Sequence, residues 1–588
     1  MKYADQLADW LVELGYTHCF FLAGGNIMHL LESCSHRFIC IPFVHEVSAG
    51  IAAEYFNEIS SNGKAFALVT AGPGLTNIVT AIAGAYLESH ELLVLGGQVK
   101  VSDLSRGQVR QRGIQEIDGV DIVRPITVTS TILTEVVDKG TFAHIVQSGS
   151  FGRKGPVFVE VPLDLQGRQV DPATLNGPAG TIAEPVIPQV SDALLRSIAA
   201  RLQAAHRPVL LLGGGIARST ASELLQALAR LGVPLMTTWN GIDRIPSEHP
   251  LYFGRPNTWG QRSSNILLQQ SDLVIALGTR LGLQQTTFNW QRFVPEGDVI
   301  QVDCDAAELE KGHPKVSLPI CGDANGVLRY LASGTSGDYR EWIEFCHLVR
   351  KEVPLVEPVN LTSEGFLSPY VFADELSHLC DGRDVVIPCS SGGAYTVMMQ
   401  TFAQKAGQRI VNTKGLAAMG YGLGGALGAS LANRETRTIL VEGDGGFMQN
   451  LQELGTVSAN QLNLKIFLFE NGGYASIRMT QINYFDGHYV GCDTNTGLGI
   501  PKWDLIFAAY GIPVIRVGNG FQQDEDFLRH FNSIGAAAFL VKIDPKQTYF
   551  PKITSRVTAN GSMESNPLHL MSPELPAEIA AKVFRYLS

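Results

Sequence analysis

One carboxylate and one carboxamide each stand at the end of a short apolar run. Asp444 lies in a Gly-Asp-Gly-Gly turn after the run 438–441, and Asn471 follows the run 464–469. Both runs are typical of strands, and open α/β sheets bind ligands at the carboxyl ends of their strands. Carboxylate, amide and carbonyl oxygens suit Mg²⁺, which takes about six hard oxygen ligands. The pair therefore predicts a site for a metal-bound diphosphate.

The glycines around Asp444 let the backbone turn tightly and approach a ligand. The stretch from about 449 to 459 has helical apolar spacing, so the unit is predicted to be strand, glycine turn, helix, strand. An ordinary βαβ unit with a glycine-rich turn is the alternative interpretation. The glycines of the turn are Gly443, Gly445 and Gly446.

A second carboxyl group, that of Glu46, begins a predicted helix directly after a predicted strand at 38–44. Its side chain would lie at the edge of a sheet, where an acid can hold or transfer a proton. A first-turn glutamate that compensates the helix dipole is the alternative. The phrase TAGPGLTN at 70–77 predicts a Gly-Pro-Gly turn into a helix, where backbone can approach a ligand, or else a tight βα loop.

The polar stretch 106–118 follows a predicted strand and is too polar for a core, so it predicts a loop over the site. Gln115 in this loop is a candidate for substrate contact. A solvated loop glutamine is the alternative.

Composition limits the function classes. The chain has 588 residues and 45% hydrophobic residues, which predicts three or four domains with their own cores. The formal net charge of −11 argues against a nucleic-acid partner. Nine cysteines without a CxxC pair indicate reduced thiols. The amphipathic N-terminus and the lack of a long apolar run predict a cytoplasmic protein that does not insert into membranes.

Apolar strand patterns alternate with helix patterns along the chain, which predicts three α/β units with parallel sheets. The expected domains are 1–170, 190–335 and 365–545, followed by a capping tail at 546–588 with a final helix. Linkers are predicted around 170–190 and 333–365. Predicted strands lie at 19–22, 66–70, 91–97 and 156–162 in the first unit, and at 208–216, 233–238, 272–278 and 298–303 in the second.

Five phrases occur in the order found in thiamine-diphosphate (ThDP) enzymes: HEVSAGIAAEYF, TAGPGLTN, GPVFVEVPLDL, LAAMGYGLGGALGA and GDGGF with NGGY. Over almost its whole length the chain resembles the acetohydroxyacid synthase and pyruvate decarboxylase branch of these enzymes. The resemblance implies three doubly wound parallel-sheet domains. The first binds the pyrimidine ring, the second is central, and the third binds the diphosphate. It also implies a homodimer or homotetramer whose sites lie between the first domain of one chain and the last of another.

The resemblance assigns roles to individual residues. Glu46 would bond to the pyrimidine ring and drive formation of the reactive cofactor, and Met419 would hold the cofactor bent, although a core methionine is the alternative. Asp444, Asn471 and the Gly473 carbonyl would bind Mg²⁺. Gln115 joins Glu46 and Met419 as a catalytic candidate. Further cofactor contacts are predicted at Pro73, Asn77, Gly393, Gly443, Gly445, Gly446 and Tyr474, and substrate contacts at Gly25, Ser476 and Arg478.

The central unit resembles a flavin-binding pattern at a few positions. It lacks the acid and the second arginine of that pattern, because Gly282 and Gln284 stand there. FAD therefore stays an open alternative, with a structural role if it is bound. The matching positions are Gly213, Gly214, Gly215, Arg280 and Asp323.

Departures from the family pattern bear on the reaction. Leu163 stands where acetohydroxyacid synthases usually have lysine, Ile114 stands where they have phenylalanine, and no tryptophan follows NGGY. The His-His pair of pyruvate decarboxylases is also missing. These differences argue against classical acetolactate synthesis and against a pyruvate-decarboxylase-like role.

The leading hypothesis is a carboligase that decarboxylates a 2-oxo acid, pyruvate first, and joins the acyl unit to a carbonyl acceptor. The tail phrase SNPLHLMSPEL resembles acetolactate-synthase-like proteins of surface-polysaccharide pathways, which suggests a keto-sugar nucleotide as acceptor. A decarboxylase or acyloin lyase without ligation is one alternative. A non-catalytic regulatory homologue is the other.

Overall fold

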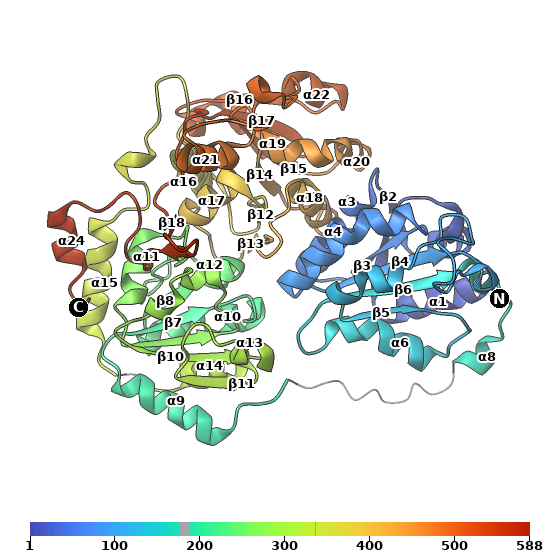
Figure 1. The fold of residues 1–588 in the computed structure, drawn as a ribbon, viewed down its shortest axis with the longest axis horizontal. Helices are drawn as coiled ribbons and strands as arrows, with labels where there is room; N and C mark the ends of the chain where they lie inside the picture. The colour runs from blue at the N-terminus through green and yellow to red at the C-terminus, as the bar shows by residue number, and fades with distance from the viewer. Residues whose placement is uncertain (177–186, 336, 588) are drawn as a thin grey trace.

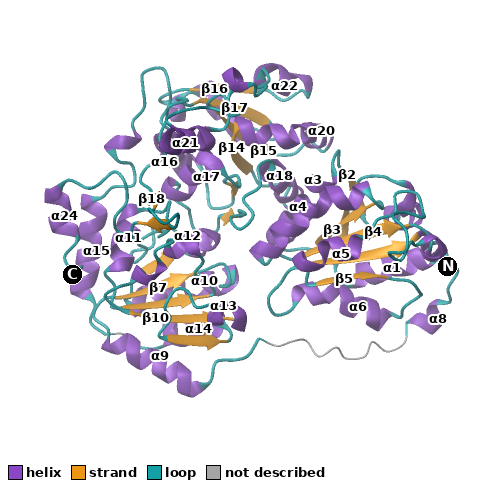
Figure 2. Ribbon diagram, in the orientation of Figure 1, coloured by secondary structure: helices purple, strands orange, loops and turns teal. Residues whose placement is uncertain are grey.

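Three parallel β-sheets organise the chain, and each is covered by helices (Figures 1 and 2). The computed structural model describes residues 1–176, 187–335 and 337–587. The predicted fold class, three parallel-sheet α/β units, is confirmed. The predicted linker at 170–190 falls largely on 177–186, which lies outside the described residues.

The first sheet has the strand order β2-β1-β3-β4-β6-β5. Every residue of β4 and β6 is buried, because helices cover both faces of the sheet, and this explains their continuous apolar sequences. The strands are β1 Tyr16–Phe21, β2 Ile39–Pro42, β3 Lys64–Val69, β4 Leu92–Gln98, β5 Thr129–Ile132 and β6 Pro156–Pro162. The helices are α1 Tyr3–Glu13, α2 Met28–Ser35, α3 Glu46–Ile59, α4 Pro73–Glu88, α5 Gly119–Val123, α6 Lys139–Gln147, α7 Leu163–Gln166 and α8 Pro172–Leu175.

The central sheet has the order β11-β10-β9-β7-β8. Its strands are β7 Pro208–Leu212, β8 Leu235–Thr237, β9 Leu273–Leu277, β10 Asp298–Asp303 and β11 Leu318–Cys321. Its helices are α9 Asp192–Ala204, α10 Arg218–Leu231, α11 Arg262–Gln269, α12 Leu283–Thr286, α13 Ala306–Glu310 and α14 Ala324–Ser333, and α15 Arg340–Glu352 follows.

The third sheet has the order β13-β12-β14-β15-β17-β16 and contains both apolar runs that end in Asp444 and Asn471. Its strands are β12 Val385–Ile387, β13 Arg409–Ile410, β14 Thr438–Gly443, β15 Leu464–Glu470, β16 Val514–Val517 and β17 Ala537–Lys542. Its helices are α16 Pro369–Leu379, α17 Gly392–Thr401, α18 Tyr421–Ala432, α19 Asp444–Phe447, α20 Leu454–Ala459, α21 Ala475–Phe485, α22 Trp503–Ala509 and α23 Glu525–Asn532.

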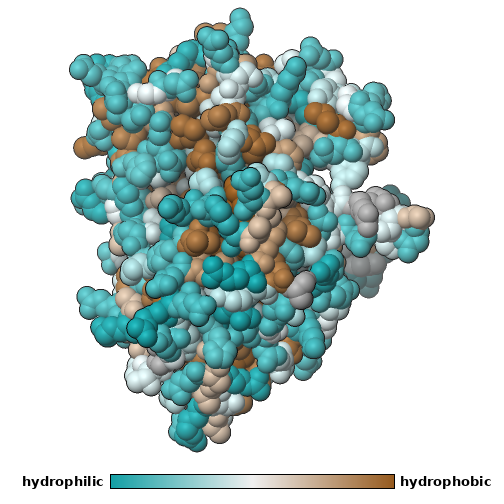
Figure 3. All heavy atoms as spheres, turned by 90° about the vertical axis from the view of Figure 1, so that its left-hand side faces the viewer, coloured by the Kyte–Doolittle hydropathy of each residue, from teal (hydrophilic) through white to brown (hydrophobic). Residues whose placement is uncertain are grey.

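The tail packs mainly on the central unit. Ile553, Leu568, Met571 and Val583 belong to the core of that unit, and α24 (Ala577–Val583) packs against α15 (Figure 1). The face that carries α15 and α24 shows separate hydrophobic patches among hydrophilic residues (Figure 3). A short antiparallel pair, β18 Ser555–Val557 and β19 Met563–Ser565, lies within the tail.

Helices α3 and α18 join the first unit to the third through a glycine face. A Cβ at Gly424 would lie 3.1 Å from the side chain of Ile51, and one at Gly428 would lie 2.0 Å from the carbonyl oxygen of Ala52. No other residue type allows this approach of the two backbones. This contact lies within one chain, whereas the resemblance implies that the first and last domains of different chains form the site.

A buried charged cluster connects α3 to the central unit. His90 Nδ1 lies 2.7 Å from Glu54 Oε1, Arg218 Nη1 lies 3.1 Å from Glu58 Oε2, and Arg218 Nε lies 2.7 Å from Asp243 Oδ2. Burial opposes a charge on His90, but Glu58 and Glu54 outweigh burial and raise its pKa to about 9. His90 is therefore a cation at neutral pH in the folded protein.

We predict that this cluster loses stability at alkaline pH. The pKa of His90 is about 9 in the folded chain and about 6.5 in an unfolded one. Its contribution, on the order of 3 kcal/mol, is complete below pH 6.5 and is lost as the pH rises through 9. Thermal unfolding of wild type and His90→Gln from pH 6 to 10 should give midpoints that converge with rising pH. A constant gap between the two proteins would contradict the prediction.

Candidate active site

The carboxylate of Asp444 forms the centre of the third unit's site. Asp444 begins α19, directly after β14, and is only 1% exposed. Its oxygens accept backbone N–H bonds from Gly445 (2.7 Å), Gly472 (2.8 Å), Asn471 (3.1 Å) and Gly473 (3.3 Å). Burial raises the pKa to about 6, although these N–H groups oppose the shift. One side chain thus holds the loop after β15 against the end of β14.

The segment after Asp444 differs in detail from the sequence prediction. The expected glycine turn is the short helix α19, and the expected helix at 449–459 is a 3₁₀ segment, Met448–Glu453, followed by α20. Asn450 interrupts the helical geometry, with φ −132°. Its side chain donates a 2.8 Å hydrogen bond to the Gly420 carbonyl, next to Met419. This tertiary contact replaces regular helix geometry.

Three oxygen atoms lie close together: one of the Asp444 carboxylate, the Asn471 carboxamide oxygen and the Gly473 carbonyl oxygen. The carboxamide oxygen of Asn471 lies 3.3 Å from Asp444 Oδ1 and 2.8 Å from the Gly473 carbonyl oxygen, and exchanging its O and N would turn both contacts into hydrogen bonds. In the orientation observed, the three oxygens form a donor set that suits a hard cation. Among the described residues, no group of three or more His, Cys, Asp or Glu could hold a metal. A cation here would therefore depend on the single carboxylate of Asp444 together with amide, carbonyl and ligand oxygens.

Glu46 and Asn77, both predicted site residues, contact each other. Glu46 is the first residue of α3 and is 4% exposed. Asn77, on α4, donates a 3.0 Å hydrogen bond to Glu46 Oε2. Glu46 Oε1 has no hydrogen-bond partner in the described part of the chain. Pro73 begins α4, so the Gly-Pro-Gly turn positions Asn77 as predicted for a helix start.

Glu453 is a residue that the sequence analysis missed. Its side chain crosses from the third unit to the first, where Oε1 accepts the N–H groups of Val44 (3.1 Å) and His45 (3.0 Å). Oε2 accepts a 2.7 Å bond from the Thr456 hydroxyl. Burial raises the pKa of this carboxyl group. Glu453 therefore fixes the two residues that precede Glu46.

The segment 444–453 thus reaches all three predicted motifs. It begins with Asp444, bonds through Asn450 to the residue after Met419, and bonds through Glu453 to the residue before Glu46. Met419 is 41% exposed, so the alternative of a core methionine is excluded. Its role in shaping a cofactor stays a prediction.

Glu442 is a second buried acid that the sequence did not single out. It lies on β14, two residues before Asp444, and is 0% exposed. Neither of its oxygens has a hydrogen-bond partner among the described residues. Burial raises its pKa to about 7. A Cβ at Gly422 would lie 2.5 Å from one of its oxygens, so the glycines around it make room for this carboxyl group.

Gln115 lies in a loop beside the Gly-Pro-Gly turn at the start of α4, the helix that carries Asn77. A Cβ at Gly72 would lie 2.3 Å from the Gln115 carbonyl oxygen, and Gln115 itself has φ +65°. Glu116 holds the loop, because its carboxylate accepts the N–H groups of Ser105, Arg112 (2.8 Å) and Gly113 (3.1 Å). These bonds outweigh burial and lower its pKa. The Gln115 side chain is exposed.

Arg478 differs from its predicted role as a substrate contact. It is 5% exposed, and its guanidinium donates to the carbonyls of Asn471 (2.8 Å) and Gly472 (3.3 Å). It therefore positions the loop that carries the three oxygens.

The other predicted contacts of this region surround the same loop. A Cβ at Gly445 would lie 2.5 Å from the ring of Tyr474, and one at Gly392 would lie 3.8 Å from the Ser476 hydroxyl. Gly25 begins a 3₁₀ turn in the first unit, and a Cβ there would meet nothing within 4 Å.

The candidate flavin residues are accounted for by the packing of the central unit. The N–H groups of Gly213 and Gly215 bond to the carbonyls of Leu277 and Gly278, both at 2.9 Å. Asp323 caps α14 by accepting from Asn325 N (2.9 Å) and Gly326 N (3.1 Å). These groups make bonds within the protein, and FAD binding stays a prediction. Gly214 and Arg280 give no independent evidence for a bound flavin, and we derive no reaction step through FAD.

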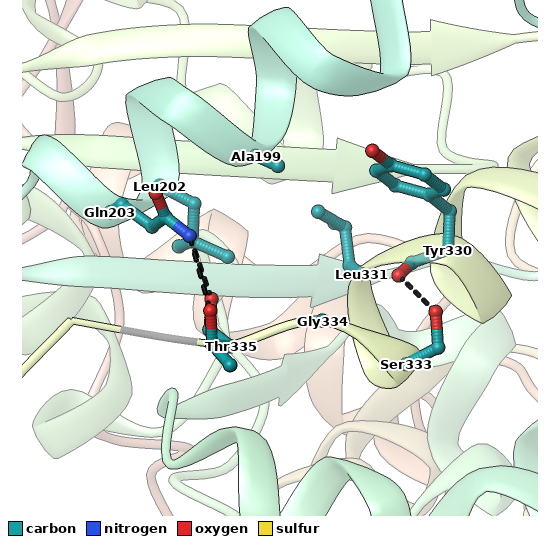
Figure 4. A pocket seen from close by; sticks show the side chains of 8 residues that line it. All are labelled: Ala199, Leu202, Gln203, Tyr330, Leu331, Ser333, Gly334 and Thr335. Atoms are coloured by element: carbon teal, nitrogen blue, oxygen red, sulfur yellow. Dashed lines mark hydrogen bonds between the residues drawn. The ribbon is translucent and has the colours of Figure 1, made fainter. Parts of the chain in front are cut away.

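A cavity of about 320 Å³ lies beside α9 and α14 (Figure 4). Gln203 donates to Thr335 across it, and Tyr330 is its one titratable lining side chain. It contains none of the predicted site residues. We assign no function to it.

Comparisons with known proteins agree with these motifs. Three family models match the chain: "Thiamine pyrophosphate enzyme, N-terminal TPP binding domain" at 1–122, the central domain at 195–331, and the C-terminal TPP binding domain at 391–540. The acetolactate synthase isozyme 1 large subunit of Escherichia coli is 29% identical over 94% of this chain and 95% of its own length. The acetolactate synthase large subunit of Corynebacterium glutamicum is 30% identical over 88% of this chain and 82% of its own length.

The chain belongs to the thiamine pyrophosphate enzyme family. It is a ThDP-dependent enzyme of the acetolactate synthase type, and the predicted family resemblance is confirmed. Glu46 lies in the N-terminal TPP binding domain, and Asp444 and Asn471 lie in the C-terminal one. The tail from residue 546 lies beyond the ranges that the three family models match. In the described ranges, no helix is both long and apolar enough to cross a membrane.

Removal of the Glu453 carboxyl group should destabilise this ThDP enzyme. Glu453→Ala leaves the buried N–H groups of Val44 and His45 without their acceptor, which costs about 1–3 kcal/mol. Glu453→Gln keeps one acceptor oxygen and should lose less. Urea unfolding of the two variants and the wild type measures the difference. An alanine variant as stable as the wild type would show that Glu453 does not hold the two units together.

Proposed function

We propose that this enzyme decarboxylates a 2-oxo acid, with pyruvate as donor, and joins the acyl unit to an acceptor carbonyl. The observation that carries the proposal is the contact of the segment 444–453 with the Asp444 loop, with the residue after Met419 and with the residue before Glu46. The proposal is supported because this one segment contacts the parts of the chain that carry the groups proposed to bind the diphosphate, shape the cofactor and supply the acid.

ThDP, when bound, supplies the carbon that attacks the 2-oxo acid and accepts the electron pair released with CO₂. Glu46 would hold a proton at the pyrimidine nitrogen, with Asn77 fixing Oε2 and leaving Oε1 for the ring. Asp444, Asn471 and the Gly473 carbonyl would hold Mg²⁺ against the diphosphate, and Arg478 keeps their loop in place. Met419 would support the bent cofactor.

The proposal includes an oligomeric state. We expect a homodimer or a homotetramer, as the resemblance implies. The glycine contact between α3 and α18 joins, within one chain, the unit that carries Glu46 to the unit that carries Met419 and Asp444. The same contact made between two chains would complete two sites per dimer.

The charges of the loop 105–116 favour an anionic acceptor. Arg106, Arg110 and Arg112 are exposed, and none of their guanidinium groups has a partner in the described part of the chain. Glu116, the acid at the end of this loop, is buried and bound to backbone N–H groups, so it does not neutralise them. Guanidinium groups bind phosphate oxygens well. A phosphorylated acceptor, such as a keto-sugar nucleotide, fits this surface in a chain whose net charge is −11.

Release of CO₂ from pyruvate tests the donor and the role of Glu46. Purified protein with ThDP and Mg²⁺ should release CO₂, and Glu46→Gln should be slower by about 100-fold or more, because it cannot transfer the proton. Glu32→Gln, an exposed substitution on α2, serves as the control. No release by wild type that has bound ThDP would exclude pyruvate as the donor. Release without any ligated product, in the presence of added aldehydes or ketones, would favour the decarboxylase alternative.

A matched pair of acceptors tests the arginines. Dihydroxyacetone phosphate and dihydroxyacetone share a ketone and differ in the phosphate. Replacing Arg106, Arg110 and Arg112 with Gln should raise the KM for the phosphate compound about tenfold and leave that for dihydroxyacetone unchanged, because only the charge-assisted bonds are lost. Gln at the exposed residues Arg196, Arg201 and Arg230 of the central unit provides the control. An equal change for both acceptors would contradict an anion-binding role.

A further inference from the structure

A tyrosine of the tail contacts the first turn of α17. Tyr549 is 1% exposed, and a Cβ at Gly393 would lie 2.1 Å from Cζ of its ring and 2.4 Å from its hydroxyl oxygen. The space that a side chain at position 393 would need is thus filled by Tyr549. This explains a glycine that the sequence predicts as a cofactor contact, and it adds a tail residue to the same place.

The Tyr549 hydroxyl is buried without a hydrogen-bond partner among the described residues, and so is Nε of Arg478. A tyrosine hydroxyl keeps its proton at neutral pH, so this group can donate, and Arg478 and Asn471 are among the groups that act on it. A buried donor without an acceptor costs free energy. Two such donors beside one loop indicate that an acceptor group belongs there.

The surroundings indicate what kind of acceptor it is. Gly393 is the second residue of α17, and the first N–H groups of a helix have no partner within the helix. Helix α21 begins nearby, because the Ser476 hydroxyl lies 3.8 Å from where a Gly392 Cβ would stand. Two helix N-termini and two buried donors together favour an anion with several oxygens, and phosphate has that chemistry.

We propose that the Tyr549 hydroxyl and Arg478 Nε donate hydrogen bonds to the diphosphate of ThDP, so that the tail contributes directly to the cofactor site. This inference rests on the proposed diphosphate site. Tyr549 acts as a positioning residue for the cofactor and has no part in proton transfer. The tail, which otherwise packs on the central unit, thereby connects that unit to the diphosphate loop.

The substitution Tyr549→Phe separates this role from a structural one. Phenylalanine keeps the ring that fills the space at Gly393 and removes only the hydroxyl. The apo protein should therefore unfold at the same temperature as the wild type or at a higher one, because a buried unpartnered donor is gone. The dissociation constant for ThDP at fixed Mg²⁺, measured by titration calorimetry on the full chain, should rise about tenfold.

A second tyrosine offers a matched control. Tyr370, on α16, is 0% exposed, and its hydroxyl also lacks a hydrogen-bond partner among the described residues. Tyr370→Phe should change thermal stability in the same direction and leave the affinity for ThDP unchanged. Inorganic diphosphate, titrated into apo protein, should lose affinity in Tyr549→Phe by a factor similar to that for ThDP.

The outcomes are distinguishable. If wild type binds ThDP and Tyr549→Phe binds it equally well, the inference is overturned and the proposed function stands. If wild type binds neither ThDP nor inorganic diphosphate, the proposed cofactor site is wrong and the inference falls with it. A lower affinity accompanied by a lower unfolding temperature of the apo variant would indicate a structural role for the hydroxyl and would also overturn the inference.

Discussion

The arrangement of the site depends on one carboxylate that crosses between two units of the chain. Glu453 accepts the N–H groups of Val44 and His45 and so fixes where α3 begins. The same segment starts at Asp444, whose carboxylate accepts the N–H groups of the loop after β15. Each acid accepts backbone N–H groups, so it fixes the path of the chain itself. The distance between the acid of the first unit and the oxygens of the third therefore follows from one short segment.

Sequence patterns predict most of the inner strands, β12 and β17 excepted, and the motifs at their ends, because burial on both faces requires continuous apolar runs and because glycine turns follow them. They do not predict the edge strands β5, β11, β13 and β16. Thr129–Ile132 is half-buried and largely polar, and Arg409–Ile410 is only two residues long, so neither has a recognisable period. These strands form because a neighbouring strand offers its hydrogen-bonding edge, which is a tertiary effect.

The site residues divide in the same way. Asp444, Asn471 and Glu46 stand in motifs whose spacing can be read along the chain. Glu453 and Tyr549 cannot be recognised so, because a buried glutamate or tyrosine in an apolar stretch resembles its solvated counterparts in sequence. Their roles come from partners that are 408 residues away for Glu453 and His45, or from a glycine that leaves room for a ring. Arg478 shows the reverse case, since a charge that suggests a substrate contact is used on backbone carbonyls.

The glycine face between α3 and α18 also limits how the enzyme can move. Where one backbone touches another, as at Gly428 and Ala52, neither helix can slide or rotate without a clash. The contact therefore restricts relative movement of the two units that carry Glu46 and Asp444. Substrate entry must then use parts with few anchors. The loop 105–116 is such a part, because its backbone is held chiefly by the single carboxylate of Glu116. An opening of that loop would leave the geometry of the reacting groups unchanged.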